Sequence, residues 1–156
     1  MSKSEVFQGI IQLAQLAFEE IVETFQYLED WEDRYRHIIE LGKEMPKLEI
    51  VSKTDNNKVN GCASQVWIDS SIEQSDNQFV YYFDGESDAL IVSGLISILR
   101  CLYNGLSVSE VMSVNFENEM DRLGLREHLS SQRSNGLRSM VNRIRQTAKN
   151  SLMTPS

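Results

Sequence analysis

The stretch SQVWIDSSIEQSDNQFVYYF, residues 64–83, decides the fold class of this chain. Its two outer parts, residues 64–72 and 78–83, are rich in the β-branched and aromatic residues that favour strands. Residues 73–77 between them are polar and include the turn formers Asp76 and Asn77. The stretch therefore predicts an antiparallel hairpin.

Helical patterns surround this hairpin on both sides. Apolar residues recur at helical spacing over residues 4–28, and a second helix is predicted from Asp30 through Leu41, ended by Gly42 and Pro46. After the hairpin, further helices are predicted at 87–102, where Ser87 is the cap and most of the helix is expected to be buried, from a capping box at Ser107, at 117–129 and at 135–150. Residues 151–156 are expected to fray. The order predicts an α+β fold, a small antiparallel β-sheet packed against helices in one domain spanning residues 1–156.

Composition limits the function classes. The 156 residues, 41% hydrophobic and 24% charged, are typical of one globular domain. The net charge of −8 argues against nucleic acid as a partner, because binding phosphates needs a basic face. No apolar run approaches the roughly 20 residues of a membrane span, and no signal-peptide pattern opens the chain. We therefore expect a cytoplasmic protein without membrane contact.

Cys62 is the first candidate for chemistry. It follows the turn-forming pair Asn60-Gly61 at the end of a polar connection that starts near Pro46. A loop tip makes a reactive group accessible to another molecule. The alternative is a small, inert side chain packed at the start of a strand, as free cysteines often are. Spacing alone favours neither interpretation.

The other candidate groups have structural interpretations. Cys101 lies on an apolar helix, which indicates a packed core thiol. Two cysteines form neither a disulfide framework nor a structural zinc site, so we expect no metal. His37 and His128 could act as acid-base groups, but isolated histidines near apolar residues are usually structural.

Four patches of the chain, in order, resemble the SufE family. They are YRHIIELGK at residues 35–43, VNGCASQVW at 59–67, SDALIVSGL at 87–95 and HLSSQRSNGL at 128–137. The resemblance extends over residues 30–148, and the second and fourth patches are its most specific parts. Ala63 stands where we expect glutamine in many members, and Gln132 replaces a small residue. Neither departure removes a reactive group.

The resemblance implies a SufE/IscU-like fold and a sulfur acceptor. In this family a SufS-type cysteine desulfurase holds sulfur from cysteine as a persulfide, and the SufE-like protein accepts the outer sulfur and stimulates the desulfurase. It then passes sulfur toward a SufBCD-type scaffold for iron-sulfur cluster assembly. The resemblance implies a transfer accessory more than a stand-alone enzyme, with no cofactor of its own, because pyridoxal phosphate belongs to the desulfurase. It allows a monomer or a homodimer.

Cys62 matches the cysteine that forms the persulfide in the family. Candidates for partner binding or support around it are Gly61, Gln65, Asp88 and Arg133. Because only a thiolate attacks, we expect Lys58, Arg133 or the docked desulfurase to favour the charged form of Cys62. The family also implies an apolar recess that shelters the sulfur, and a loop that extends on docking.

The supporting residues also have structural interpretations. Arg133 could bind backbone carbonyls or a carboxylate, and Asp88 could stabilise the start of a helix. The side chains of Trp67, Val66 and Ile68 are expected to belong to the core under the sheet.

Other functions remain to be compared with the carrier. A CsdE-like carrier for another sulfur pathway shares the same patches. A U-type iron-sulfur scaffold would draw on about three cysteines, more than the two present. A cysteine hydrolase would need a histidine base in contact with Cys62 and an oxyanion site.

Overall fold

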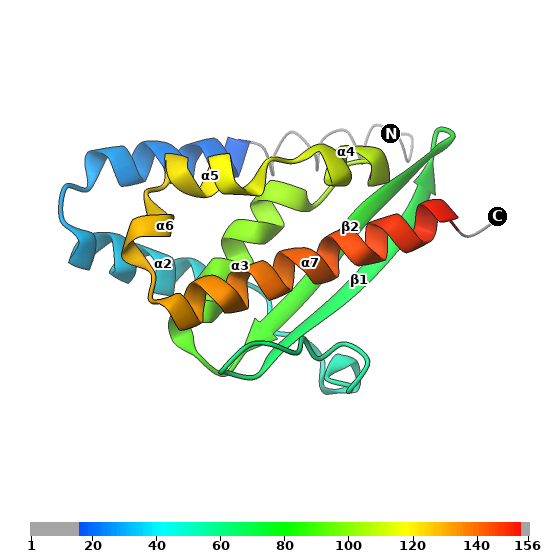
Figure 1. Ribbon diagram of the computed structural model, residues 1–156, viewed down its shortest axis with the longest axis horizontal. Coiled ribbons are helices and arrows are strands. Elements are labelled where there is room, and N and C mark those ends of the chain that lie inside the picture. The colour runs from blue at the N-terminus through cyan, green and yellow to red at the C-terminus, as the bar shows by residue number, and fades with distance from the viewer. Residues whose placement is uncertain (1–15, 154–156) are drawn as a thin grey trace.

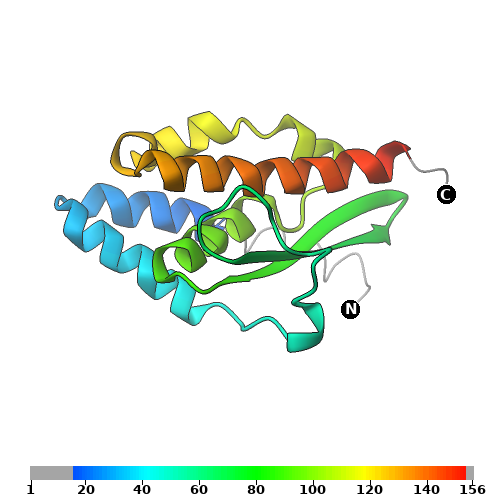
Figure 2. The same cartoon turned by 60° about the horizontal axis from the view of Figure 1, so that its bottom comes forward.

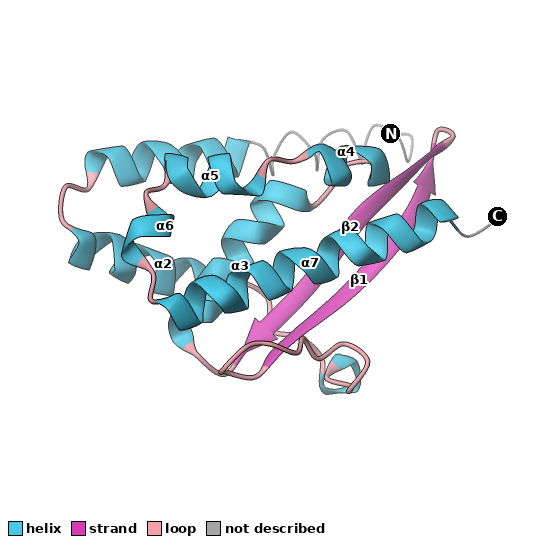
Figure 3. Ribbon diagram, in the orientation of Figure 1, coloured by secondary structure: helices cyan, strands magenta, loops and turns pink. Residues whose placement is uncertain are grey.

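The computed structural model describes residues 16–153, which form helices around one two-stranded sheet (Figures 1 and 3). The predicted helix at 4–28 is described over residues 16–27, and its earlier part lies outside the described residues. The remaining elements are α2 (Trp31–Glu44), the 3-10 turn η1 (Ile50–Ser52), β1 (Val66–Ser75), β2 (Gln78–Ser87), α3 (Leu90–Tyr103), α4 (Val108–Ser113), α5 (Phe116–Arg122), α6 (Leu125–His128) and α7 (Ser131–Met153). The α+β prediction is confirmed.

The predicted hairpin is present but longer than expected. β1 and β2 pair in antiparallel register from Val66 opposite Ser87 to Ser75 opposite Gln78. The turn contains only Asp76 and Asn77, both with positive φ, as in the type I′ turns that match strand twist. The expected five-residue link was therefore too long, because Asp and Asn tolerate the left-handed conformation that a two-residue turn requires.

Gly85 explains why β2 continues beyond its predicted end. A side chain at this position would come within 2.9 Å of the Ile96 side chain on α3 and 3.0 Å of the Trp67 carbonyl. Asp84-Gly85-Glu86 reads locally as a turn, but the strand uses glycine to let α3 approach the sheet.

Gly42 has a similar role and does not end its helix. Asp30 caps α2 by accepting a hydrogen bond from the Glu32 amide at 3.0 Å, and the helix continues to Glu44. A Cβ at Gly42 would lie 2.6 Å from the Gly94 amide, and one at Gly94 would lie 2.0 Å from the Ile38 carbonyl. The two glycines allow α2 and α3 to cross at backbone contact. The predicted stop at Gly42 is therefore wrong, whereas the predicted end before Pro46 is confirmed, since the helix cap is Met45.

The later helices differ from the predictions mainly at their ends. The Ser107 capping box is confirmed, with Glu110 as its partner. The helix predicted over 117–129 is split into α5 and α6 at Gly124, which has φ +68. The α3 helix begins at Leu90, three residues after the predicted cap, and Leu90 is 59% exposed, so the expectation of an almost wholly buried helix is only partly met.

The α7 helix spans residues 131–153 and lies across one face of the sheet (Figures 1 and 2). It extends to Met153, beyond the predicted start of fraying at 151, and residues 154–156 lie outside the described part. Buried side chains from the sheet, α3 and α7 form one core, including Val66, Ile68, Tyr81, Phe83, Leu95, Leu99, Leu137, Val141 and Ile144. The connection between α2 and β1, which carries Cys62, packs against this core.

Candidate functional site

Cys62 lies in a short loop whose two ends are held together. The Val59 amide donates to the Val66 carbonyl at 2.8 Å, so residues 60–65 form a loop outside the ladder. Gly61 has φ +92, and a Cβ there would lie 2.5 Å from the Ser139 hydroxyl of α7. Glycine is therefore required at the residue before Cys62, both for conformation and for space.

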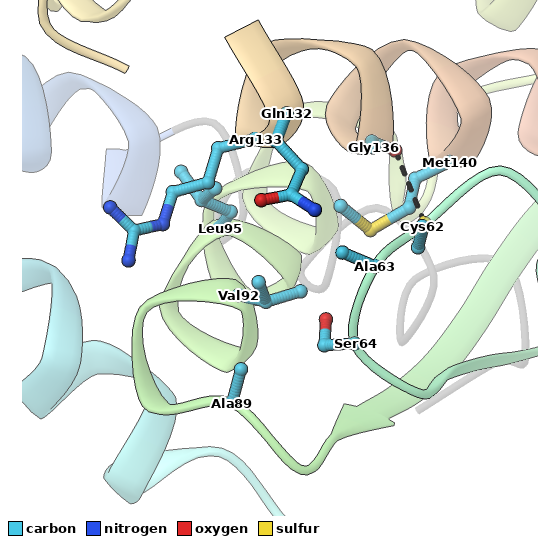
Figure 4. Close-up of a pocket in the computed structure, with 10 residues that line it drawn as sticks. All are labelled: Cys62, Ala63, Ser64, Ala89, Val92, Leu95, Gln132, Arg133, Gly136 and Met140. Carbon is cyan, nitrogen blue, oxygen red and sulfur yellow. Dashed lines mark hydrogen bonds between the residues drawn. The ribbon is translucent and has the colours of Figure 1, made fainter. Parts of the chain in front are cut away.

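The loop closes over a recess of about 180 Å³ between α3 and α7 (Figure 4). Its lining is mostly small or apolar. The loop contributes Cys62, Ala63 and Ser64, α3 and the residue before it contribute Ala89, Val92 and Leu95, and α7 contributes Gln132, Arg133, Gly136 and Met140. Segments far apart in sequence thus meet around one thiol, as expected for a sheltered cysteine.

The Cys62 thiol is half-buried and donates toward the Gly136 carbonyl, with 3.5 Å between Sγ and O (Figure 4). Burial raises the pKa of this thiol, because the charged form loses hydration, and no cation in the described part offsets the effect. The expectation that Lys58 or Arg133 favours the thiolate is therefore wrong for this conformation. Inside the recess Cys62 is a protonated, poorly nucleophilic thiol at neutral pH.

Arg133 lies at the rim of the recess, in the first turn of α7. Its side chain is exposed and extends away from Cys62 (Figure 4). Within the described part of the chain its guanidinium makes no hydrogen bond or ion pair. Arg133 is thus not a structural arginine bound to a carbonyl or a carboxylate, and its charge is presented to solvent beside the thiol.

Gln65 and Asp88 join the far end of the loop to the start of α3. The backbone amide of Gln65 donates to the Asp88 carboxylate at 3.0 Å, and the backbone amide of Asp88 donates to the backbone carbonyl of Gln65 at 3.3 Å. Both side chains are exposed. The Asp88 carboxylate therefore binds a backbone amide of the loop, and the Gln65 side chain faces solvent.

Sequence reasoning missed the residue that anchors the near end of the loop. Arg143 of α7 donates to the Asn56 carbonyl at 2.8 Å and to the Lys58 carbonyl at 2.7 Å. No local pattern could reveal these contacts, because the partners are 85 or more residues apart and are backbone atoms. Gly136 and Met140 were missed for the same reason, although Gly136 lies in a patch that resembles the SufE family.

The remaining candidates lie outside the recess. Cys101 is partly buried against the core, and its pKa is raised by burial, as expected for a packed thiol. His128 stacks on Trp31 with 3.7 Å between ring centres, and His37 packs edge-on to Phe25. Both histidines have structural contacts, and neither lines the recess.

The three residues expected in the sheet core are divided by the structure. Val66 and Ile68 are buried, as expected, whereas Trp67 faces the other side of the sheet and is partly exposed. The Lys53 ammonium lies 5.4 Å from the Trp67 ring centre, within cation–π distance.

Residues 16–153 contain neither a metal-binding cluster nor a membrane-spanning helix. No group of three or more His, Cys, Asp or Glu side chains in this range is arranged to hold a metal ion. None of the helices in this range is both long enough and apolar enough to cross a membrane.

Comparison with known proteins identifies a family model that matches this chain and several similar proteins. Residues 19–148 match the family model described as SufE, Fe-S metabolism associated domain. An uncharacterized SufE-like protein of Rhizobium meliloti is 45% identical over 87% of this chain and 97% of its own, and another of Rhizobium etli is 46% identical over 88% and 93%. The solution structure of a hypothetical protein from Thermus thermophilus superposes with a TM-score of 0.69 over 88% of this chain and 96% of its own, at 19% identity. That last likeness concerns the fold alone.

Proposed function

The chain belongs to the SufE family, and from this premise we propose that Cys62 accepts sulfur from a SufS-type cysteine desulfurase and passes it on for iron-sulfur cluster assembly. Family membership supports a sulfur-transfer role in Fe-S metabolism together with a cysteine desulfurase. The observation that carries the finer proposal is the position of Cys62, on a loop held at both ends and at the mouth of a small apolar recess.

The proposed reaction is a transfer of one sulfur atom between two cysteines. The Cys62 thiolate attacks the outer sulfur of the donor persulfide, so a new S–S bond forms at Cys62. The S–S bond of the donor breaks, and the donor cysteine leaves as a thiolate. Cys62 becomes the persulfide, and no external oxidant or reductant is consumed.

The raised pKa of Cys62 suits a resting form that reacts only with its partner. Within the recess the thiol is protonated and therefore slow toward small electrophiles. Drawing the loop out would rehydrate the sulfur and favour the thiolate at the moment of transfer. After transfer the recess can shelter the added sulfur, since about 180 Å³ exceeds the roughly 30 Å³ share of one water-sized group.

The supporting residues have separate roles in this proposal. Gly61 allows the loop to turn beside α7, and Asp88 holds the loop amide of Gln65 in the closed form. The exposed Gln65 side chain and the unpaired Arg133 guanidinium are available for contact with the docked desulfurase. Among the described residues that line the recess, Arg133 is the one with a charged side chain, and it is the group that would favour a thiolate after the loop moves.

Two other functions fit the geometry less well. A cysteine hydrolase needs a base beside its nucleophile, but both histidines of the chain lie outside the recess. A U-type scaffold needs more thiolates around one cluster, and Cys101 does not line the recess of Cys62.

The partners that follow the desulfurase are part of the proposal too. We propose a SufBCD-type scaffold as the recipient, with a CsdE-like role in another sulfur pathway as the alternative. We propose that this single domain acts in the cytoplasm, where thiols stay reduced, as a monomer or homodimer.

Alanine formation from cysteine by a SufS-type desulfurase tests this proposal. The wild-type chain and Cys101→Ser are expected to raise the rate, whereas Cys62→Ser is expected to lose that stimulation. Equal stimulation by the wild type and Cys62→Ser would contradict the role of Cys62, because sulfur would not need this thiol as its acceptor.

A further inference from the structure

A second hollow, a groove of about 560 Å³, lies next to the Cys62 recess, on the other side of residues 87–90. Ser64 in the recess accepts a hydrogen bond from Ser87, and Ser87 lines the groove. Ala89 lines the recess, whereas the next residue, Leu90, lines the groove. The recess and the groove are therefore neighbours, and the segment that separates them is residues 87–90.

The groove collects apolar side chains that solvent can reach. Its lining includes Ile50, which is 86% exposed, and Leu90, which is 59% exposed. Val51, beside Ile50, is 78% exposed. Exposed apolar residues gathered at one place indicate an interaction surface, whereas scattered ones do not. The connection between α2 and β1 carries two of these residues outside the helical body (Figure 2).

The groove is also positive in a chain that is strongly acidic. Its lining holds Lys43, Lys47 and Lys53 against one carboxylate, Glu86. Lys53 forms an ion pair with Glu86, and Glu86 also accepts from the Leu48 amide. Lys43 and Lys47 form no ion pair within residues 16–153. The pKa of Glu86 is lowered mainly by its hydrogen bond with Lys53, and the charge of Lys47 makes the smallest contribution. Glu44 and Glu49 are exposed nearby in sequence but do not line the groove.

We propose that this groove binds an acidic segment of the cysteine desulfurase, one that carries apolar side chains, while the desulfurase engages Cys62; the inference rests on the proposed function. A specific protein interface uses about 20–30 residues on each partner, whereas ten residues line the recess. The footprint must therefore extend beyond Cys62. The groove is the adjoining surface with exposed apolar residues, and its unpaired lysines select a partner of opposite charge.

Two double variants test the groove without changing the Cys62 loop. Lys43→Glu with Lys47→Glu reverses the charge, and Ile50→Ser with Leu90→Ser removes the apolar contacts. A matched control, Phe79→Ser with Lys149→Glu, changes one exposed apolar residue and one exposed lysine outside the groove. Circular dichroism and thermal melting establish that each variant folds.

The readouts are the dissociation constant for a purified SufS-type desulfurase, by calorimetry, and the chain concentration that gives half-maximal stimulation. We expect both to rise at least tenfold for each groove variant and to stay within twofold for the control, with the maximal rate unchanged. Raising the salt concentration should weaken the wild type more than the lysine variant, since surface charges are screened.

Unchanged affinity in both groove variants, with a wild-type chain that still accepts sulfur, would overturn the groove inference alone. Loss of binding to a second copy or to a sulfur recipient, but not to the desulfurase, would overturn it too. A wild-type chain that accepts no sulfur from the desulfurase would instead overturn the proposed function, and this inference with it.

Discussion

Cys62 combines two properties that rarely favour reactivity, partial burial and a hydrogen bond to a neutral carbonyl. Desolvation raises its pKa, and the Gly136 carbonyl accepts only from the protonated form. Both effects stabilise the thiol relative to the thiolate. At the scale of the residue, the free protein therefore holds Cys62 in an unreactive state.

Alkylation by iodoacetamide should reveal this state. With Cys101→Ser as background, we expect the alkylation rate of Cys62 to rise with pH around a midpoint above the ordinary thiol value of about 8.5. The sign follows because a raised pKa leaves less thiolate at any pH below it. Intact mass against time at several pH values measures the rate. A midpoint below that of a small reference thiol would contradict the account.

Gly61 and Gly136 form a matched pair for a second prediction. Gly61→Ala places a Cβ at positive φ and 2.5 Å from the Ser139 hydroxyl, so we expect a loss of about 1–3 kcal/mol in the free energy of unfolding. Gly136→Ala meets only ordinary contacts, the nearest with Cys62 Sγ at 3.5 Å, and removes a helix glycine. That control is expected to be neutral or to gain up to about 1 kcal/mol. Urea unfolding of both variants measures these changes in the free energy of unfolding. Equal changes in the two variants would contradict the strained conformation expected at position 61.

At the scale of the element, α7 positions the Cys62 loop through Arg143. Arg143→Gln should remove two charge-assisted hydrogen bonds to the loop base and cost about 1–3 kcal/mol. Hydrogen exchange of the Val59 amide, which donates to Val66, should become faster, and Cys62 alkylation should become faster with it.

Arg145 supplies the control for that prediction. It lies two residues further along α7 and donates to the Met112 carbonyl at 3.1 Å, away from the loop. Arg145→Gln is expected to lower stability without changing Cys62 alkylation. Equal acceleration in both variants would mean that general loosening of the fold, and not the loop base, controls access to the thiol.

The crossing of α2 and α3 depends on one small residue from each helix. Gly94→Ala would place a methyl group 2.0 Å from the Ile38 carbonyl, so the helices must separate. We expect a loss of about 1–3 kcal/mol or more, as for other overpacked cores, seen as a lower midpoint in urea. An unchanged midpoint would show that the crossing adapts without cost.

These glycines also show why some element ends could not be predicted from sequence. The strands and helices themselves follow from periodicity, and the Ser107 capping box is a local pattern that the structure confirms. Gly42 and Gly85 resemble stop signals, but each is required by a neighbour distant in sequence. The local sequence cannot distinguish a glycine that ends a helix or strand from a glycine that allows a neighbouring element to pack closely.

At the scale of the whole molecule, the part of the site that depends on local pattern could be predicted, and the part that depends on contacts between distant segments could not. The loop tip at Cys62 was visible in the Asn60-Gly61 turn, and the resemblance to the SufE family singled out the thiol. The recess was not derivable from local pattern, because its walls come from the loop, α3 and α7. The pKa of Cys62 depends on burial by those walls, so the sequence alone could not show that neither Lys58 nor Arg133 lowers it.

The whole arrangement places one half-buried thiol beside a groove lined by exposed apolar side chains and lysines. The central proposal is that Cys62 receives the sulfur atom. The most direct measurement is the intact mass of the chain after incubation with a SufS-type desulfurase and cysteine. A gain of about 32 mass units is predicted for the wild type and Cys101→Ser and is absent from Cys62→Ser. The same gain in Cys62→Ser, or no gain in the wild type, would contradict the account.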